Sequence, residues 1–400
     1  MNYIEKLEHY LKISIILSIA IVVSFQTTVS FAYERNAMGV TAVGGNDDQT
    51  ELLKSAINGK AETVKALLEK GVDPNLQNEK GFTPLIVAAQ YGHNAVVTLL
   101  LDNNAQLDLQ NAGGATALIL AAKNDHDTVV ESLLAKGANT DLQTTDGISA
   151  LMLAAQNGNE AIVDALLDRK ANVNLQTEQK VTALILAAMA GRDAIVDRLL
   201  TSNAKIDMQV IDGTTALYMA VRNNHVAIVN TLLAKGAPVN LIAINNTTPL
   251  HVAAQNGYIE IVNALLEKGI NLEQADKNDA TALTLAALMG QTEVVRILLE
   301  HGAKIDHKAR TGFTPLILAA QNGHVPVIQV LLEKGAKVNL QNDDGVTPLM
   351  WAALHEHEEA VKLLLEQGAD LSIKSDSGKT ALEITRNAAI TELLQSAAAR

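Results

Sequence analysis

The chain has 400 residues, of which 31 are Lys or Arg and 44 are Asp or Glu, so its formal net charge is −13, and it contains no cysteine. A protein that binds nucleic acid needs a stripe of basic residues, and no cluster of Lys and Arg recurs here, so that class is disfavoured. The absence of cysteine excludes disulfides, thiol chemistry and a lipid anchor on cysteine.

The first 32 residues have the pattern of an export signal. An apolar run of thirteen residues extends from Ile13 to Phe25 and is followed by Ser30-Phe31-Ala32, whose small first and third residues predict cleavage between Ala32 and Tyr33. A membrane span needs about 20 residues, which favours a cleaved signal peptide (1–32) over an uncleaved anchor, although the anchor stays an alternative. We therefore expect a periplasmic or secreted protein that meets a membrane only through this segment if it is retained.

From residue 50 onward, a tripeptide of the form Thr-Pro-Leu or Thr-Ala-Leu returns every 33 residues. Such a fixed period is typical of a solenoid, in which each unit buries its apolar face against its neighbours. The sequence predicts eleven units over 50–400, after a flexible lead-in at 33–49. The tripeptides begin at Thr83, Thr116, Thr182, Thr215, Thr248, Thr281, Thr314, Thr347 and Thr380, with Ser149 standing in once and Thr50 one step earlier.

The sequence of each unit predicts two short helices followed by a polar hairpin, which we call the finger. The threonine caps the first helix, a proline fits its first turn, and an Ala-Ala pair lets helices approach closely. Glycines such as Gly92 and Gly257 end this helix, because glycine accepts the left-handed conformation of a helix end. The second helix has apolar residues at helical spacing, as in Ile162, Val163 and Leu166.

The departures from this pattern are few. Lys170 and Lys180 occupy positions that usually hold Gly or Asn, where a positive φ costs a lysine about 1 kcal/mol. Their junction is therefore a weak point, a different turn, or the result of sequence drift in a tolerant loop. Lys54 in the first unit and Thr385-Arg386 in the last replace apolar residues, as expected for solvent-facing caps of a solenoid.

The unit resembles the ankyrin repeat, most clearly in the segment Thr248-Pro249-Leu250-His251-Val252-Ala253-Ala254, and the resemblance extends over 50–400. It implies an all-α ankyrin solenoid of helix-turn-helix units with short fingers. It also implies a scaffold that binds a protein or peptide with its finger tips and with the exposed face of the first helices, which together line the concave side.

Amide side chains are frequent on those expected binding positions. They either grip an extended peptide, because amides donate and accept hydrogen bonds, or bond to one another along the solenoid. The first-helix amides are Gln156, Asn157, Gln255, Asn256, Gln321 and Asn322, and the finger-base amides are Gln77, Gln110, Gln143, Gln176, Gln209 and Gln341.

Apolar residues on the same positions form a second candidate surface. An exposed apolar patch with a polar rim usually marks an interaction site, and the alternative is that neighbouring fingers pack these residues on each other. Tyr91 and Phe82 are a smaller candidate, whereas Trp351 is expected to pack in the core. The apolar set is Met189, Val210, Ile211, Ile242, Ile244, Leu288 and Met289.

The sequence contains no motif for catalysis or for a cofactor. It has no Gly-rich phosphate loop and no serine at a strand-to-helix elbow. Of the ten histidines, the tightest cluster, His355-Glu356-His357, offers two imidazoles, which is weak evidence for a metal. Five of the ten, His357 among them, share one position after the first helix and are expected to be structural: His93, His126, His225, His324 and His357.

We therefore predict a non-enzymatic, monomeric scaffold without metal or cofactor that binds a protein or peptide partner. An enzyme of undetected type and a structural spacer of the cell envelope are the alternatives. A spacer would gain nothing from apolar residues on a face that should be wet, which argues against it.

Overall fold

The computed structural model describes residues 47–399, which form two compact units, 47–117 and 118–399, each described here by itself. Residues 1–46, with the predicted signal peptide and most of the lead-in, lie outside the described residues. Residues 47–49 belong to the helix α2, which begins at Asp47, and not to the predicted lead-in. Within the described part of the chain, the only β-pairing is an isolated bridge between Gln143 and Ser149, in agreement with the predicted all-α fold.

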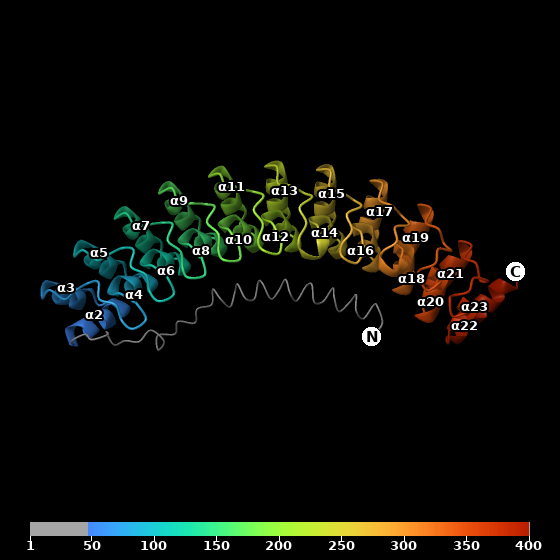
Figure 1. Ribbon diagram of the computed structural model, residues 1–400, viewed down its shortest axis with the longest axis horizontal. Coiled ribbons are helices and arrows are strands. Elements are labelled where there is room, and N and C mark those ends of the chain that lie inside the picture. The colour runs from blue at the N-terminus through green and yellow to red at the C-terminus, as the bar shows by residue number, and fades with distance from the viewer. Residues whose placement is uncertain (1–46, 400) are drawn as a thin grey trace. The chain divides into compact units, whose positions relative to one another are not determined.

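The first unit contains two helix pairs. In Figure 1, α2 and α4 lie in one row, and α3 and α5 lie in a second row. Neighbours in each row pack side by side, as the solenoid prediction requires. The helices are α2 (Asp47–Ile57), α3 (Ala61–Glu69), α4 (Pro84–Gln90) and α5 (Asn94–Asp102).

The second unit continues the same pairs. The first helices, from α8 to α20, lie along the concave side of this unit and the second helices lie along its convex side (Figure 1). Its helices are α6 (Ala117–Lys123), which begins on the last residue of the first unit, α7 (Asp127–Ala135), α8 (Ala150–Asn157), α9 (Glu160–Asp168), α10 (Ala183–Ala190), α11 (Asp193–Thr201), α12 (Ala216–Arg222), α13 (Val226–Ala234), α14 (Pro249–Asn256), α15 (Ile259–Glu267), α16 (Ala282–Leu288), α17 (Thr292–Glu300), α18 (Pro315–Gln321), α19 (Val325–Glu333), α20 (Pro348–Leu354), α21 (Glu358–Glu366), α22 (Ala381–Ile384) and α23 (Ala388–Ala398), with 3₁₀ turns η2 (Ile244–Asn246) and η3 (Arg310–Gly312).

The predicted helix caps are present. The Thr83 hydroxyl accepts the Ile86 N–H at 3.1 Å, and Gly257 ends α14 with φ 74°. Ala253 and Ala254 are fully buried, which lets neighbouring first helices approach closely. The last repeat is truncated, because α22 has four residues and its Thr380 and Glu383 form a capping box.

The junction at Lys170 and Lys180 keeps the ordinary turn. Both lysines adopt the left-handed conformation, with φ 61° and 62°. The alternative of a different turn is therefore wrong, and the strain expected of a lysine at positive φ is located here.

His251 is a buried histidine that completes the cap of α14. Its Nδ1 accepts the Thr248 N–H at 3.1 Å, its Nε2 contacts the Ala280 carbonyl at 3.1 Å, and burial lowers its pKa. Because the unfolded chain then binds a proton more readily than the folded chain, this histidine stabilises the fold fully above about pH 6.5 and loses that contribution as the pH falls below this value.

We predict that His251→Ile reduces the acid sensitivity of the repeat at 248–280. Isoleucine is found at the same position in Ile86, Ile185 and Ile317, so the core accepts it. Hydrogen exchange of 248–280 at pH 7.5 and 5.5 should show a smaller loss of protection in the variant than in the wild type. An equal loss would show that another group titrates.

Candidate protein-binding surface

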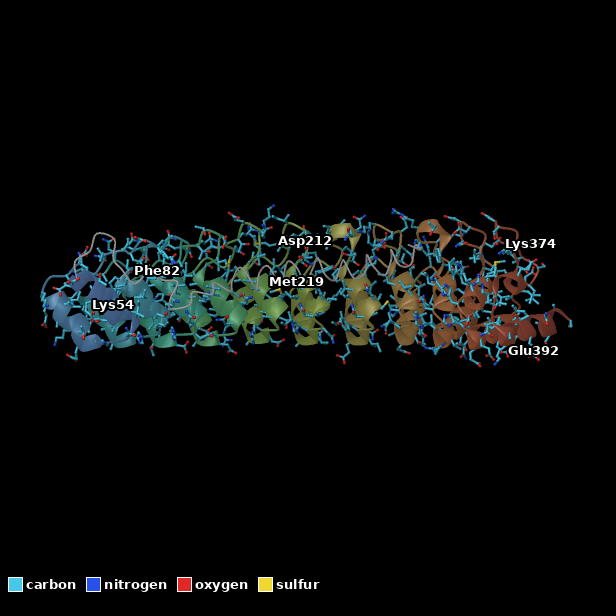
Figure 2. The ribbon with its side chains drawn as sticks, turned by 90° about the horizontal axis from the view of Figure 1, so that it is seen from below. Lys54, Phe82, Asp212, Met219, Lys374 and Glu392 are labelled. Carbon is cyan, nitrogen blue, oxygen red and sulfur yellow. The ribbon has the colours of Figure 1, made fainter. Side chains whose placement is uncertain are left out.

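Backbone hydrogen bonds join neighbouring fingers of the second unit. The Ile211 N–H donates to the Gln179 carbonyl at 3.2 Å, and the Ile244 N–H donates to the Asp212 carbonyl at 2.6 Å. Figure 2 shows the finger residues Asp212 and Lys374 along one edge of the second unit, while Met219 lies among the helices. The fingers of this unit therefore form a continuous row in which neighbouring tips are adjacent.

A polar side chain at the position of Asn78 stabilises the turn of a finger. In the first finger the Asn78 carboxamide oxygen accepts the N–H groups of Lys80 and Phe82 at 3.0 and 2.9 Å. Such a side chain stabilises the turn by replacing missing backbone partners.

The finger at 242–247 lacks this acceptor because Ala243 occupies the position. Its turn instead places Asn245 and Asn246 at φ 66° and 61°, a conformation that asparagine tolerates better than most residues. The Thr247 hydroxyl donates to the Ile244 carbonyl at 3.1 Å and contacts the Tyr218 hydroxyl at 3.1 Å. This alternative turn holds Ile244 at the finger tip with 61% of its surface exposed.

Three of the predicted apolar residues form an exposed cluster on two adjacent fingers. Ile211 is 63% exposed, Ile242 43% and Ile244 61%. Ile211 and Ile244 occupy the same position of consecutive repeats, and Ile242 lies two residues before Ile244. We call Ile211, Ile242 and Ile244 the isoleucine patch.

The other predicted apolar residues behave differently. Met289 is 44% exposed at the end of α16, and Met189 at the end of α10 is half-buried. The expected exposure of Val210 and Leu288 is wrong, because both are buried. Val210 occupies the position of Asn78, whose side chain turns toward its own finger, and α16, which carries Leu288, packs between α14 and α18.

The predicted aromatic candidate is also corrected. Phe82 is fully buried in the first unit, because the last finger residue turns its side chain back toward the helices. Tyr91 is half-buried, and its ring lies 6.1 Å from that of His93. Trp351, expected in the core, is half-buried, with its ring 5.5 Å from the rings of both Phe313 and His355.

The finger-base amides of Gln77 and Gln341 hold fingers together through backbone carbonyls. The Gln77 amide donates to the Gly81 carbonyl at 3.1 Å in its own finger and to the Gln110 carbonyl at 3.2 Å in the next. Gln341 bonds in the same way to the carbonyls of Gly345 and Lys374. The glutamine row thus ties fingers through backbone carbonyls.

The first-helix asparagines have a similar role. The Asn256 amide, although exposed, donates to the Val252 carbonyl of its own helix at 2.8 Å. Gln255 is half-buried, and its backbone carbonyl accepts the Gln291 amide at 3.2 Å. The side-chain oxygen of Gln321, in contrast, is buried without a hydrogen-bond partner among the described residues.

The repeated histidines are structural as predicted. The ring Nε2 of His93 contacts the Ile57 carbonyl at 2.9 Å, and His324 and His357 make the same contact with the preceding repeat. The rings of His355 and His357 stack 6.3 Å apart. In the part of the chain that the structure describes, no group of three metal-ligating side chains comes together.

A family model of ankyrin repeats in three copies matches eight overlapping segments of the chain, at 52–146, 118–212, 151–243, 191–276, 217–309, 269–342, 305–375 and 337–396. The chain therefore belongs to the ankyrin repeat family, whose repeats generally mediate protein–protein interaction. A search of curated proteins found no match. Among residues 47–399, no helix is both long and apolar enough to cross a membrane.

Proposed function

We propose that this protein is a non-enzymatic scaffold that, after export, holds a partner protein or peptide on the isoleucine patch and the adjacent concave positions. The observation that carries the proposal is the exposure of three isoleucines on two neighbouring fingers. A group of exposed aliphatic residues on an otherwise polar surface usually marks an interaction site.

The energetics of the patch fit a binding anchor. Burying an isoleucine side chain contributes about 1.5–3 kcal/mol, and a few such anchors usually dominate an interface. The backbone hydrogen bond from Ile244 to Asp212 keeps the two tips adjacent before a partner arrives, so less conformational entropy is lost on binding.

Photocrosslinking in the native cell tests the proposal and captures the partner in the same step. A photoreactive residue at Ile244 should give discrete protein adducts. Asp343 is the matched control, because it is an exposed residue at the same finger position three repeats later. Equal adducts from both positions would contradict a specific role of the patch.

We predict that Ile211→Ser together with Ile244→Ser weakens the affinity for the crosslinked partner at least about tenfold. The reason is the loss of two aliphatic anchors that support nothing in the core, so the circular dichroism should not change. Titration calorimetry of both proteins measures the effect. The matched double variant Arg310→Ser and Asp343→Ser should retain affinity, and full affinity in the isoleucine variant would refute the proposal.

A further inference from the structure

In addition to their packing and to the backbone bonds between neighbouring finger tips, which the repeat at 215–247 keeps on both sides, the repeats are tied to one another by three recurring hydrogen bonds that involve side chains. One is the bond from a histidine-position side chain to the preceding first helix, and another is the bond from a finger-base side chain to the next finger. The third runs from a backbone N–H after the second helix to a side-chain oxygen of the preceding repeat, as from Lys337 to Asp306 at 3.2 Å.

The repeat at 314–346 has all three bonds on both sides. Toward the preceding repeat these are His324 to the Leu288 carbonyl, Lys308 to the Gln341 carbonyl and the Lys337 N–H to Asp306. Toward the following repeat they are His357 to the Gln321 carbonyl, Gln341 to the Lys374 carbonyl and the Asp370 N–H to Asn339.

The repeat at 215–247 keeps one of the three bonds on each side. Toward the preceding repeat it keeps His225 to the Met189 carbonyl, at 3.2 Å. Pro238 has no N–H to give to Asp207, and within the described residues the Gln209 amide donates only to its own finger, to Gly213.

Toward the following repeat, the bond from the Asn271 N–H to Asn240 remains at 2.9 Å. Ile242 replaces the glutamine, and Tyr258, in the histidine position, makes no hydrogen bond to the Arg222 carbonyl in the described chain. A surface cavity lies at this junction, lined by Leu233, Pro238, Leu241 and Lys268 among others.

The residue that precedes the histidine position also differs at this junction. At the junctions of His225 and His357 the ring packs against a glycine of the preceding repeat, and a Cβ added at Gly191 or Gly323 would lie 2.7 or 2.6 Å from that ring. The corresponding residue before Tyr258 is Asn224, which carries a side chain and has φ 57°.

We propose that the repeat at 215–247 is a built-in hinge, which opens locally more often than its neighbours. In a solenoid, stability is set by each repeat and its two interfaces, so a repeat with fewer interface bonds opens first. The inference does not depend on the proposed function.

Hydrogen exchange on the full chain without a partner tests the hinge. Amides of 215–247 should exchange about tenfold faster than those of 314–346, because each lost bond lowers the free energy of opening. Fraying from the chain ends predicts the opposite order, since 314–346 lies nearer an end of the sequence. Equal or slower exchange in 215–247 would overturn the proposal.

Two triple variants, with substitutions at equivalent repeat positions, test the hinge without comparing 215–247 with 314–346. Asn224→Gly, Pro238→Lys and Tyr258→His together restore bonds on both sides of the hinge and should slow exchange in 215–247. Gly323→Asn, Lys337→Pro and His357→Tyr introduce the hinge residues three repeats later and should accelerate exchange in 314–346. If both triple variants fold but leave their exchange rates unchanged, bond loss does not create a hinge.

Discussion

Replacing Phe82 by alanine should destabilise the first unit by about 3–5 kcal/mol, the usual cost of removing a fully buried phenylalanine. The ring has no exposed surface, so its loss removes apolar contacts and leaves a cavity near α4. The N–H and carbonyl of Phe82 also pair with Asn78 and close the finger, and these bonds do not need the ring. We therefore expect a packing defect with an intact turn.

Denaturation followed by hydrogen exchange measures the size and the location of this effect. Protection should fall across 47–117, while 347–399 stay protected. Phe313→Ala is the matched control, because Phe313 ends a finger of the second unit and is 4% exposed. It should cost a similar amount in that unit, and an unchanged stability of Phe82→Ala would show that the ring is not a core residue.

The sequence predicted the repeat architecture well because the period, the caps and the glycines each report local backbone geometry. Thr83, Gly257 and the buried Ala253 all do in the structure what their residue types require. These features depend on a residue and its near neighbours, so they can be read without tertiary information.

The exposure of single side chains was less predictable, because a repeat position does not say which way a side chain points. Val210 was expected to be exposed although Asn78, Asn111, Thr144 and Thr177 share its position. Short polar residues of this kind cap turns and face inward. The residue types at this repeat position could therefore have predicted that the Val210 side chain is buried. No comparable signal marked Leu288, since Leu354 at the same position is 48% exposed.

The finger with Asn245 and Asn246 differs from most of the others in its turn. Ala243 provides no side-chain acceptor there, but Val210 at the same position also provides none and its finger keeps Gly213 as the left-handed residue, so the missing acceptor alone does not determine the turn. A related turn occurs at Ala309, where Thr311 has φ 63°. The tip of that finger is the charged Arg310, so the turn alone does not make an apolar patch; the isoleucines do.

Replacing Ala253 by leucine should destabilise the repeats around it by about 3 kcal/mol, at the upper end of what overpacking costs. Ala253 has no exposed surface, and its helix α14 packs between α12 and α16. A leucine there must push these helices apart, because the small residue sets their close approach.

The effect should stay local, because each repeat contacts only its neighbours. Hydrogen exchange should accelerate within 215–313 and remain unchanged in 347–399. Val252→Leu is the matched control, since Val252 is the adjacent, half-buried residue of α14 and has room for a larger side chain. If Ala253→Leu lowered protection uniformly throughout 118–399, the second unit would unfold as one cooperative block, and a hinge at 215–247 could not open independently of the repeats beside it.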